Sequence, residues 1–138
     1  MDYGARVDGY CSDMTRTVVL GKADAEIKKV YNTVLEAQTT AIDALRAGLN
    51  CREADKIARD IIDGAGYAGC FGHSLGHGVG LDVHELPVAS KRSDTVLKPG
   101  MIVTVEPGIY IEGELGVRIE DLVLVTADGC EVLSSSPR

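Results

Sequence analysis

Two turn motifs near opposite ends of the chain place four carboxylates in two pairs. Near the N-terminus, Asp8-Gly9 is a turn dipeptide, and residues 1–20 around it have the pattern of a β-hairpin. If Asp8-Gly9 forms a two-residue loop, Asp2 pairs with Thr15. Because side chains alternate along a strand, Asp13 then lies on the same face as Asp2. The first hairpin is therefore predicted to hold two carboxylates that point the same way.

A second hairpin is expected toward the C-terminus, where residues 101–106 and 117–125 have strand composition. A three-residue loop centred on Gly113 would pair Glu106 with Glu120 directly across the ladder. A β-bulge in either hairpin would break this count. Like charges held so close repel, so each pair is expected to take up protons or to recruit a cation.

The segment between the hairpins carries two helix patterns. The first helix is predicted to start with Asp24 as N-cap and to stop near Gly48, and Gln38 interrupts its apolar stripe. The second is predicted to start with Asn50 as N-cap and to end near Gly64. Hairpins flanking two helices indicate an α+β fold in one domain.

A glycine-rich stretch follows the second helix. Residues 66–80 contain six glycines and two histidines, His73 and His77. Such a composition suits a backbone that turns sharply or approaches a ligand closely, so a loop is predicted here.

Composition argues against several classes of partner. The chain has 138 residues, 45% of them hydrophobic, and a net charge of -7. An acidic surface repels nucleic acid and anionic membranes, and no apolar run is long enough to span a bilayer. The four cysteines are scattered, which favours reduced thiols. We therefore expect a soluble, cytoplasmic protein with no nucleic-acid or membrane partner.

Four carboxylates and a histidine form a natural ligand set for two divalent ions. Hard oxygen ligands with one imidazole suit manganese, iron, cobalt or zinc, and two neighbouring ions can share a water and generate a hydroxide nucleophile. Each acidic residue taken alone is better explained as a solvated surface group. Their occurrence in order with Gly-His-Gly, Glu-Pro-Gly and Arg-Ile-Glu-Asp motifs has no comparable structural explanation.

Five segments closely resemble the Xaa-Pro aminopeptidases and Xaa-Pro dipeptidases (prolidases) of the creatinase and methionine aminopeptidase superfamily. They are residues 2–5, 9–17, 73–85, 104–108 and 118–121. The resemblance spans almost the whole chain. It implies the pita-bread fold, an α+β arrangement in which helices cover a curved antiparallel sheet.

The resemblance also implies a ligand set for two divalent metal ions, with manganese favoured and cobalt, zinc or iron as alternatives. Asp2 would bind one ion, and His77 and Glu106 would bind the other. Asp13 and Glu120 would bridge both.

Roles for other residues follow from the same resemblance. His84 would contact the substrate and stabilise the tetrahedral intermediate. His73 would belong to the substrate site, with a loop histidine held by backbone groups as the alternative. Glu106 would also accept the proton of the hydroxide. Arg118 would orient Glu120 or meet the substrate, with an ordinary exposed arginine as the alternative.

The implied activity is hydrolysis of the Xaa-Pro bond at the N-terminus of peptides or in dipeptides, the substrate carrying proline at its second position. Methionine aminopeptidases share the five ligands, so an enzyme of that kind stays an alternative. Creatinase-like hydrolases and inactive relatives that serve as binding modules form a further class, although inactive relatives typically lose ligands.

The resemblance further implies that residues 1–138 are the C-terminal portion of a metallopeptidase catalytic domain. The family extends upstream of the first ligand, with an N-terminal domain, further helices and a substrate-contacting histidine. Without those helices, one apolar face of the sheet would stay uncovered. We therefore expect self-association or pairing with the missing N-terminal segment, and a metal-binding fragment without activity remains an alternative.

Overall fold

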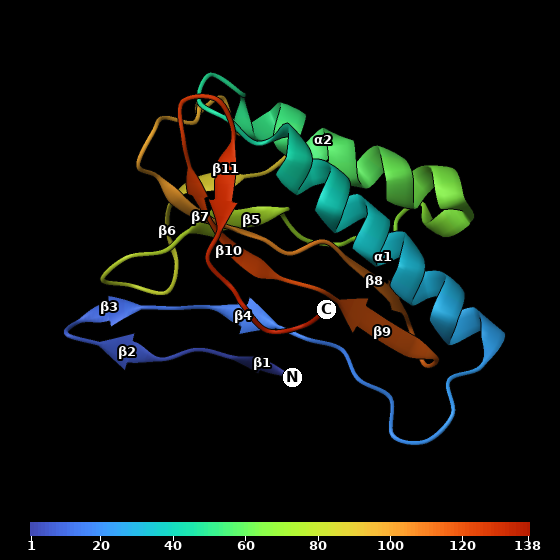
Figure 1. Ribbon diagram of the computed structural model, residues 1–138. Coiled ribbons are helices and arrows are strands. Elements are labelled where there is room, and N and C mark those ends of the chain that lie inside the picture. The colour runs from blue at the N-terminus through green and yellow to red at the C-terminus, as the bar shows by residue number, and fades with distance from the viewer.

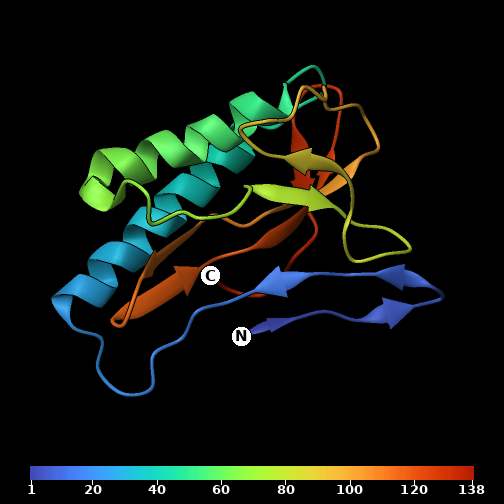
Figure 2. The same cartoon turned by 180° about the vertical axis from the view of Figure 1, so that it is seen from behind.

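The computed structural model describes all 138 residues. The fold combines antiparallel sheets with two α-helices. The chain runs through β1 (Asp2–Tyr3), β2 (Arg6–Val7), β3 (Tyr10–Cys11), β4 (Met14–Thr15), α1 (Ala25–Ala44), α2 (Cys51–Ile62), a π-helical turn (Asp63–Tyr67), β5 (Gly76–Gly78), β6 (Glu85–Ala89), β7 (Ile102–Val105), β8 (Gly108–Ile111), β9 (Leu115–Arg118), β10 (Asp121–Val125) and β11 (Cys130–Val132). Figures 1 and 2 show α1 and α2 along one side of the central strands, with the hairpin β1–β4 on the other.

The first hairpin has the predicted register. Val7 pairs with Tyr10 and Asp2 pairs with Thr15, and both turn residues, Asp8 and Gly9, have positive φ. That backbone is the one a two-residue hairpin loop requires. The prediction that strand structure continues to residue 20 is wrong, because β4 ends at Thr15. The β-branched residues beyond it have no partner strand, and propensity without pairing does not make a strand.

The second hairpin is longer and keeps one register throughout. Gly108 pairs with Arg118 in β8–β9, and Val105 pairs with Asp121 in β7–β10. Counting inward from both pairs sets Glu106 opposite Glu120, as the sequence predicts. Glu106 lies between β7 and β8, and Glu120 lies between β9 and β10, so both acidic residues are outside the hydrogen-bonded strands.

The helices form as their caps predict and bury one face each. The side chain of Asp24 accepts a hydrogen bond from the Ile27 amide, and Asn50 accepts one from the Arg52 amide. Buried apolar residues of the two helices pack with buried residues of the strands in one core: Val30, Val34, Ala37, Ala41, Ala54, Ala58 and Ile62 from the helices, and Val105, Ile109 and Val123 from the strands. Helical turns extend past Gly64, because the π-helical turn continues to Tyr67. Neither helix combines the length and apolar character needed to cross a membrane.

The glycine-rich stretch is only partly a loop, which corrects the prediction. Its last part forms β5, which lies between β6 and β7 in a five-stranded sheet of order β11-β10-β7-β5-β6. A Cβ atom on Gly76 would lie 1.9 Å from the Thr104 carbonyl oxygen, and one on Gly78 would lie 2.4 Å from the Leu86 carbonyl oxygen. Glycine is therefore required where neighbouring backbones approach the strand that carries His77.

Candidate metal centre

Three predicted ligands from distant parts of the chain converge on one point. Ligand atoms of Asp13, His77 and Glu120 all lie within 4.8 Å of one another. Asp13 precedes β4, His77 is the middle residue of β5, and Glu120 directly precedes β10. The first hairpin, strand β5 and the second hairpin therefore each contribute one ligand.

His77 is oriented by its own backbone and faces the carboxylates. Its Nδ1 donates to the Gly78 carbonyl oxygen at 3.0 Å, which turns Nε2 toward the carboxylates. Nε2 lies 3.2 Å from Glu106 Oε1 and 3.7 Å from Asp13 Oδ2. Burial alone would lower the pKa of His77, but the hydrogen bonds to Glu106 and Gly78 and the carboxylate charges raise it overall.

Glu106 is held from two sides. The Thr104 hydroxyl donates a hydrogen bond to Glu106 Oε1 at 2.9 Å and itself accepts one from the His77 amide at 3.0 Å. Burial would raise the pKa of Glu106, yet the hydrogen bonds from His77 and Thr104 hold it below its usual value. Glu106 therefore stays ionised beside the imidazole.

Glu120 is the most buried of the four carboxylates, with 2% of its surface exposed. The Thr15 hydroxyl donates to its Oε2 at 2.6 Å. Burial, and then the charges of Glu106, Asp13 and Asp2, raise the pKa of Glu120 to about 7. Burial and the charge of Asp2 also raise the pKa of Asp13. The protein therefore concentrates negative charge here at an energetic cost.

Asp2 lies at the outer edge of this group and forms an ion pair with Arg118. Arg118 Nε also donates to the Thr15 hydroxyl at 3.1 Å, and its Nη1 lies 3.4 Å from the Tyr110 hydroxyl. Arg118 therefore reaches Glu120 only through Thr15. The sequence suggested that Arg118 orients Glu120 or meets the substrate. Its direct contact with a carboxylate is instead with Asp2.

The carboxylates of this cluster have few basic partners, and this excess of negative charge suits bound cations. No lysine or arginine nitrogen lies within 4 Å of Asp13, Glu106 or Glu120, and the single imidazole of His77 is their one basic contact. Buried carboxylates without a cationic partner are costly, whereas a divalent ion would neutralise them. Carboxylate oxygens with one imidazole nitrogen are suitable donors for such an ion.

The two other predicted histidines lie beside the cluster. The ring of His84 is 4.1 Å from that of His77, centroid to centroid, and its side chain is exposed. His73 Nδ1 lies 2.8 Å from the Ser74 carbonyl oxygen and Nε2 lies 2.7 Å from the Tyr110 hydroxyl. His73 thus has a backbone contact and also faces the side-chain network around Arg118.

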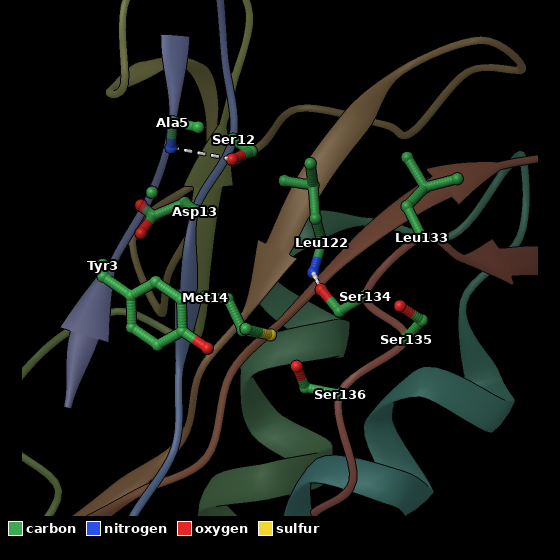
Figure 3. A pocket seen from close by; sticks show the side chains of 11 residues that line it. Tyr3, Ala5, Ser12, Asp13, Met14, Leu122, Leu133, Ser134, Ser135 and Ser136 are labelled. Carbon is green, nitrogen blue, oxygen red and sulfur yellow. Dashed lines mark hydrogen bonds between the residues drawn. The ribbon is translucent and has the colours of Figure 1, made fainter.

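Two pockets border the cluster. One, of about 420 Å³, is lined by Asp2 and Asp13 together with Val83, the neighbour of His84. The other, of about 340 Å³, lies between the first hairpin and the C-terminal segment, with Asp13 on one wall and Ser136 on the opposite one (Figure 3). Asp13 is the one proposed ligand that lines both pockets, and His77, Glu106 and Glu120 line neither.

Comparison with known proteins identifies the family. The profile of metallopeptidase family M24 matches residues 1–127. The chain belongs to this family. An Xaa-Pro dipeptidase from Pyrococcus furiosus is 49% identical over 138 residues, which cover 100% of this chain and 40% of that protein.

Solved structures of this M24 fold superpose closely. An Xaa-Pro dipeptidase from Bacillus anthracis has a TM-score of 0.98 at 55% identity, covering 99% of this chain and 39% of that one. An X-Pro aminopeptidase from Thermotoga maritima has a TM-score of 0.97 at 47% identity, with the same coverage. The expected α+β pita-bread fold is confirmed, and the chain spans 38–40% of the length of the curated relatives it matches.

Several residues of the site were missed in the sequence. Thr15 and Thr104 hold two of the carboxylates, and Tyr110 joins His73 to Arg118. Thr15 lies two residues after Asp13, and Thr104 two residues before Glu106. Along a strand that spacing places two side chains on one face, so the same alternation that paired the carboxylates could have found them.

Proposed function

We propose that this chain carries the two-ion centre of a peptidase that hydrolyses the Xaa-Pro bond, at the N-terminus of peptides or in dipeptides. Residues 1–138 would form part of one catalytic domain. The observation that carries the proposal is the convergence of Asp13, His77 and Glu120 within 4.8 Å, with Glu106 in contact with His77. Relatives described as Xaa-Pro dipeptidase and X-Pro aminopeptidase support the substrate class.

The ligands divide between two positions in this proposal. His77 and Glu106, which contact each other, would hold one ion and Asp2 the other, and Asp13 and Glu120 would bridge both. Two bound cations, manganese foremost, would supply Lewis acidity that polarises the scissile carbonyl and acidifies a coordinated water.

The side chains around the ligands would move protons and bind the substrate. Glu106 is kept ionised by His77 and Thr104, so its carboxylate can accept the proton that the attacking water loses. His84 is exposed beside His77, where it can donate to the oxyanion of the tetrahedral intermediate. His73 and Arg118 converge on Tyr110 and would contact the peptide.

A direct test compares an Xaa-Pro dipeptide, an Xaa-Pro-Xaa peptide and an otherwise identical peptide with alanine in place of proline. With manganese added, the proline peptides should be cleaved, a chelator should stop cleavage, and the alanine peptide should stay intact. Elemental analysis should find two ions in the wild type and fewer in Glu120→Gln. Proline peptides left intact despite two bound ions would contradict the activity but not the metal centre.

A second candidate function is metal binding without catalysis. It is favoured by one observation: the chain spans only 38–40% of the length of these curated relatives, so a complete substrate pocket would need further residues. The same assay separates the two candidates, because bound manganese without hydrolysis of either proline peptide supports this one. A methionine aminopeptidase-like specificity would appear as cleavage of a peptide whose first residue is methionine and whose second is not proline.

Association through the first hairpin is also proposed. Tyr3, Val7 and Tyr10 expose 51%, 67% and 66% of their surfaces. Exposed apolar groups gathered on one hairpin favour self-association or pairing with the upstream segment that the family resemblance implies. Size-exclusion chromatography with light scattering tests this, and a monomer at high concentration counts against self-association. Cytoplasmic location stays a prediction.

A further inference from the structure

Arg16 is a buried arginine whose five N–H donors all have acceptors. It exposes 5% of its surface, although it belongs to the loop after β4. Nη1 donates to the carbonyl oxygens of Thr15 at 2.9 Å and Glu120 at 2.6 Å. Nη2 donates to Asp121 Oδ1 at 2.7 Å and to the Ser136 carbonyl oxygen at 2.8 Å. The remaining donor, Nε, lies 2.9 Å from the Pro137 carbonyl oxygen.

These contacts join two sheets that share no strand ladder. The first hairpin belongs to two-stranded sheets, whereas β10 belongs to the five-stranded sheet. A single backbone hydrogen bond, from the Glu120 amide to the Thr15 carbonyl oxygen at 3.1 Å, crosses beside Arg16. One guanidinium nitrogen therefore links the strand ends that carry the two proposed bridging ligands, Asp13 and Glu120.

Asp121 fixes the guanidinium from the opposite side. It is fully buried, and its Oδ2 accepts hydrogen bonds from Gln38 Nε2 at 2.6 Å and from Arg138 at 2.6 Å. Asp121 is thus held by Gln38 of α1 and by Arg138, which makes it a fixed anchor for the planar fork of Arg16.

We propose that Arg16, anchored by Asp121, is a positioning residue that sets the separation of Asp13 and Glu120 and so allows one pair of carboxylates to bridge two cations. The inference rests on the proposed two-ion centre. Arg16 touches no ligand side chain, and it acts through the backbone of Thr15 and Glu120. Both proposed ions use Asp13 and Glu120, so loosening this link should weaken most the ion that has only Asp2 besides them, and less the ion that also has His77 and Glu106.

The deciding variant is Arg16→Lys. Lysine keeps the positive charge beside Asp121, but one ammonium cannot reproduce the guanidinium fork. We expect manganese titration by calorimetry to show the second ion bound at least about tenfold more weakly than in the wild type, the scale found when groups supporting metal ligands are removed. Electron paramagnetic resonance should show loss of the signal of two magnetically coupled Mn²⁺ ions.

A control separates positioning from general stability. Leu97→Ala makes a cavity in the core, in the loop before β7, and lowers stability without altering Arg16, Gln38, Asp121 or their contacts. It should keep both ions and their magnetic coupling. An equal loss of coupling in Leu97→Ala, or wild-type affinity and coupling in Arg16→Lys, would overturn the inference.

A second variant covers the case in which Arg16→Lys does not fold. Asp121→Asn retains an oxygen for Arg16 but removes the anchoring charge. Weaker binding of the second ion in Asp121→Asn supports the inference, and unchanged binding overturns it. A wild-type protein that binds no manganese overturns the proposed function, and the inference with it. Two ions in the wild type with unchanged variants overturn the inference alone.

Discussion

The Thr15 hydroxyl donates a 2.6 Å hydrogen bond to Glu120 Oε2, joining the first hairpin directly to a predicted ligand of the second. Residues 105 positions apart in the chain are thereby held in contact. Thr15→Val keeps the shape of the side chain but leaves this buried carboxylate without its donor. We expect manganese affinity to fall by about 10- to 100-fold in calorimetric titration. Thr15→Ser retains the hydroxyl and should stay near wild type; a matching loss in both variants would contradict the role of the hydrogen bond.

The stability of the metal-free protein should fall as pH rises toward neutrality. Burial and neighbouring carboxylates raise the pKa of Glu120 from 4.5 to about 7, so between these values the folded state binds more protons than the unfolded chain. The free energy of unfolding therefore decreases over that range, by on the order of 3 kcal/mol from this group. The raised pKa of His77 acts in the same direction, because its stabilising contribution is lost as pH rises through that pKa.

Urea unfolding with a chelator present, at pH 5 and pH 7.5, measures this effect. Glu120→Gln cannot ionise and should flatten most of the difference, while added manganese should raise the stability of the wild type at pH 7.5. An unchanged pH slope in Glu120→Gln would show that other groups cause it.

Gly76→Ala should destabilise the protein, because its Cβ would lie 1.9 Å from the Thr104 carbonyl oxygen. The strand that carries His77 would have to move away from β7, at a cost on the order of 3 kcal/mol. Gly72→Ala is the matched control, since nothing lies within 4 Å of its Cβ. Thermal unfolding should show a fall of roughly 10 °C for the first variant and little change for the second. Equal midpoints would contradict the close approach.

Asp55→Asn should weaken the support of the loop before β5. Asp55 is buried and accepts hydrogen bonds from Arg59 and the Leu75 amide, while Arg59 also donates to the carbonyl oxygens of Phe71 and His73. Removing its charge leaves Arg59 without its ionic partner, at a cost of about 3 kcal/mol.

The neighbouring helix pair Lys56–Asp60 provides the control, because it has the same spacing but is mostly exposed. Asp60→Asn should cost less than about 1 kcal/mol. Chemical denaturation of both variants measures the difference, and similar losses in the two would show that burial of Asp55 does not matter.

Alternation along strands and turn chemistry were enough to predict much of this site. The registers that pair Asp2 with Thr15 and set Glu106 opposite Glu120 follow from Asp8-Gly9 and from the loop around Gly113. These are local features, acting over a few residues on each side of a turn. The helix caps Asp24 and Asn50 were predictable for the same reason.

The strand β5 and the early end of β4 were decided by tertiary structure. Gly76 and Gly78 offer no side chains to form a pattern, and they are extended because β6 and β7 lie on either side. Residues 17–20 have strand propensity, but no neighbouring strand pairs with them. Propensity is a weak prior that pairing overrides.

What the amino-acid sequence determined by itself was the local register of each hairpin and the chemistry of its side chains. What only the tertiary structure decided was the distance between the hairpins. Contacts between residues more than 100 positions apart join the hairpins, among them the hydrogen bonds of Arg16 with Glu120 and Asp121. The physical reason is that turns and alternation constrain only neighbours, whereas two carboxylates share a cation only when the packing of whole sheets brings them together.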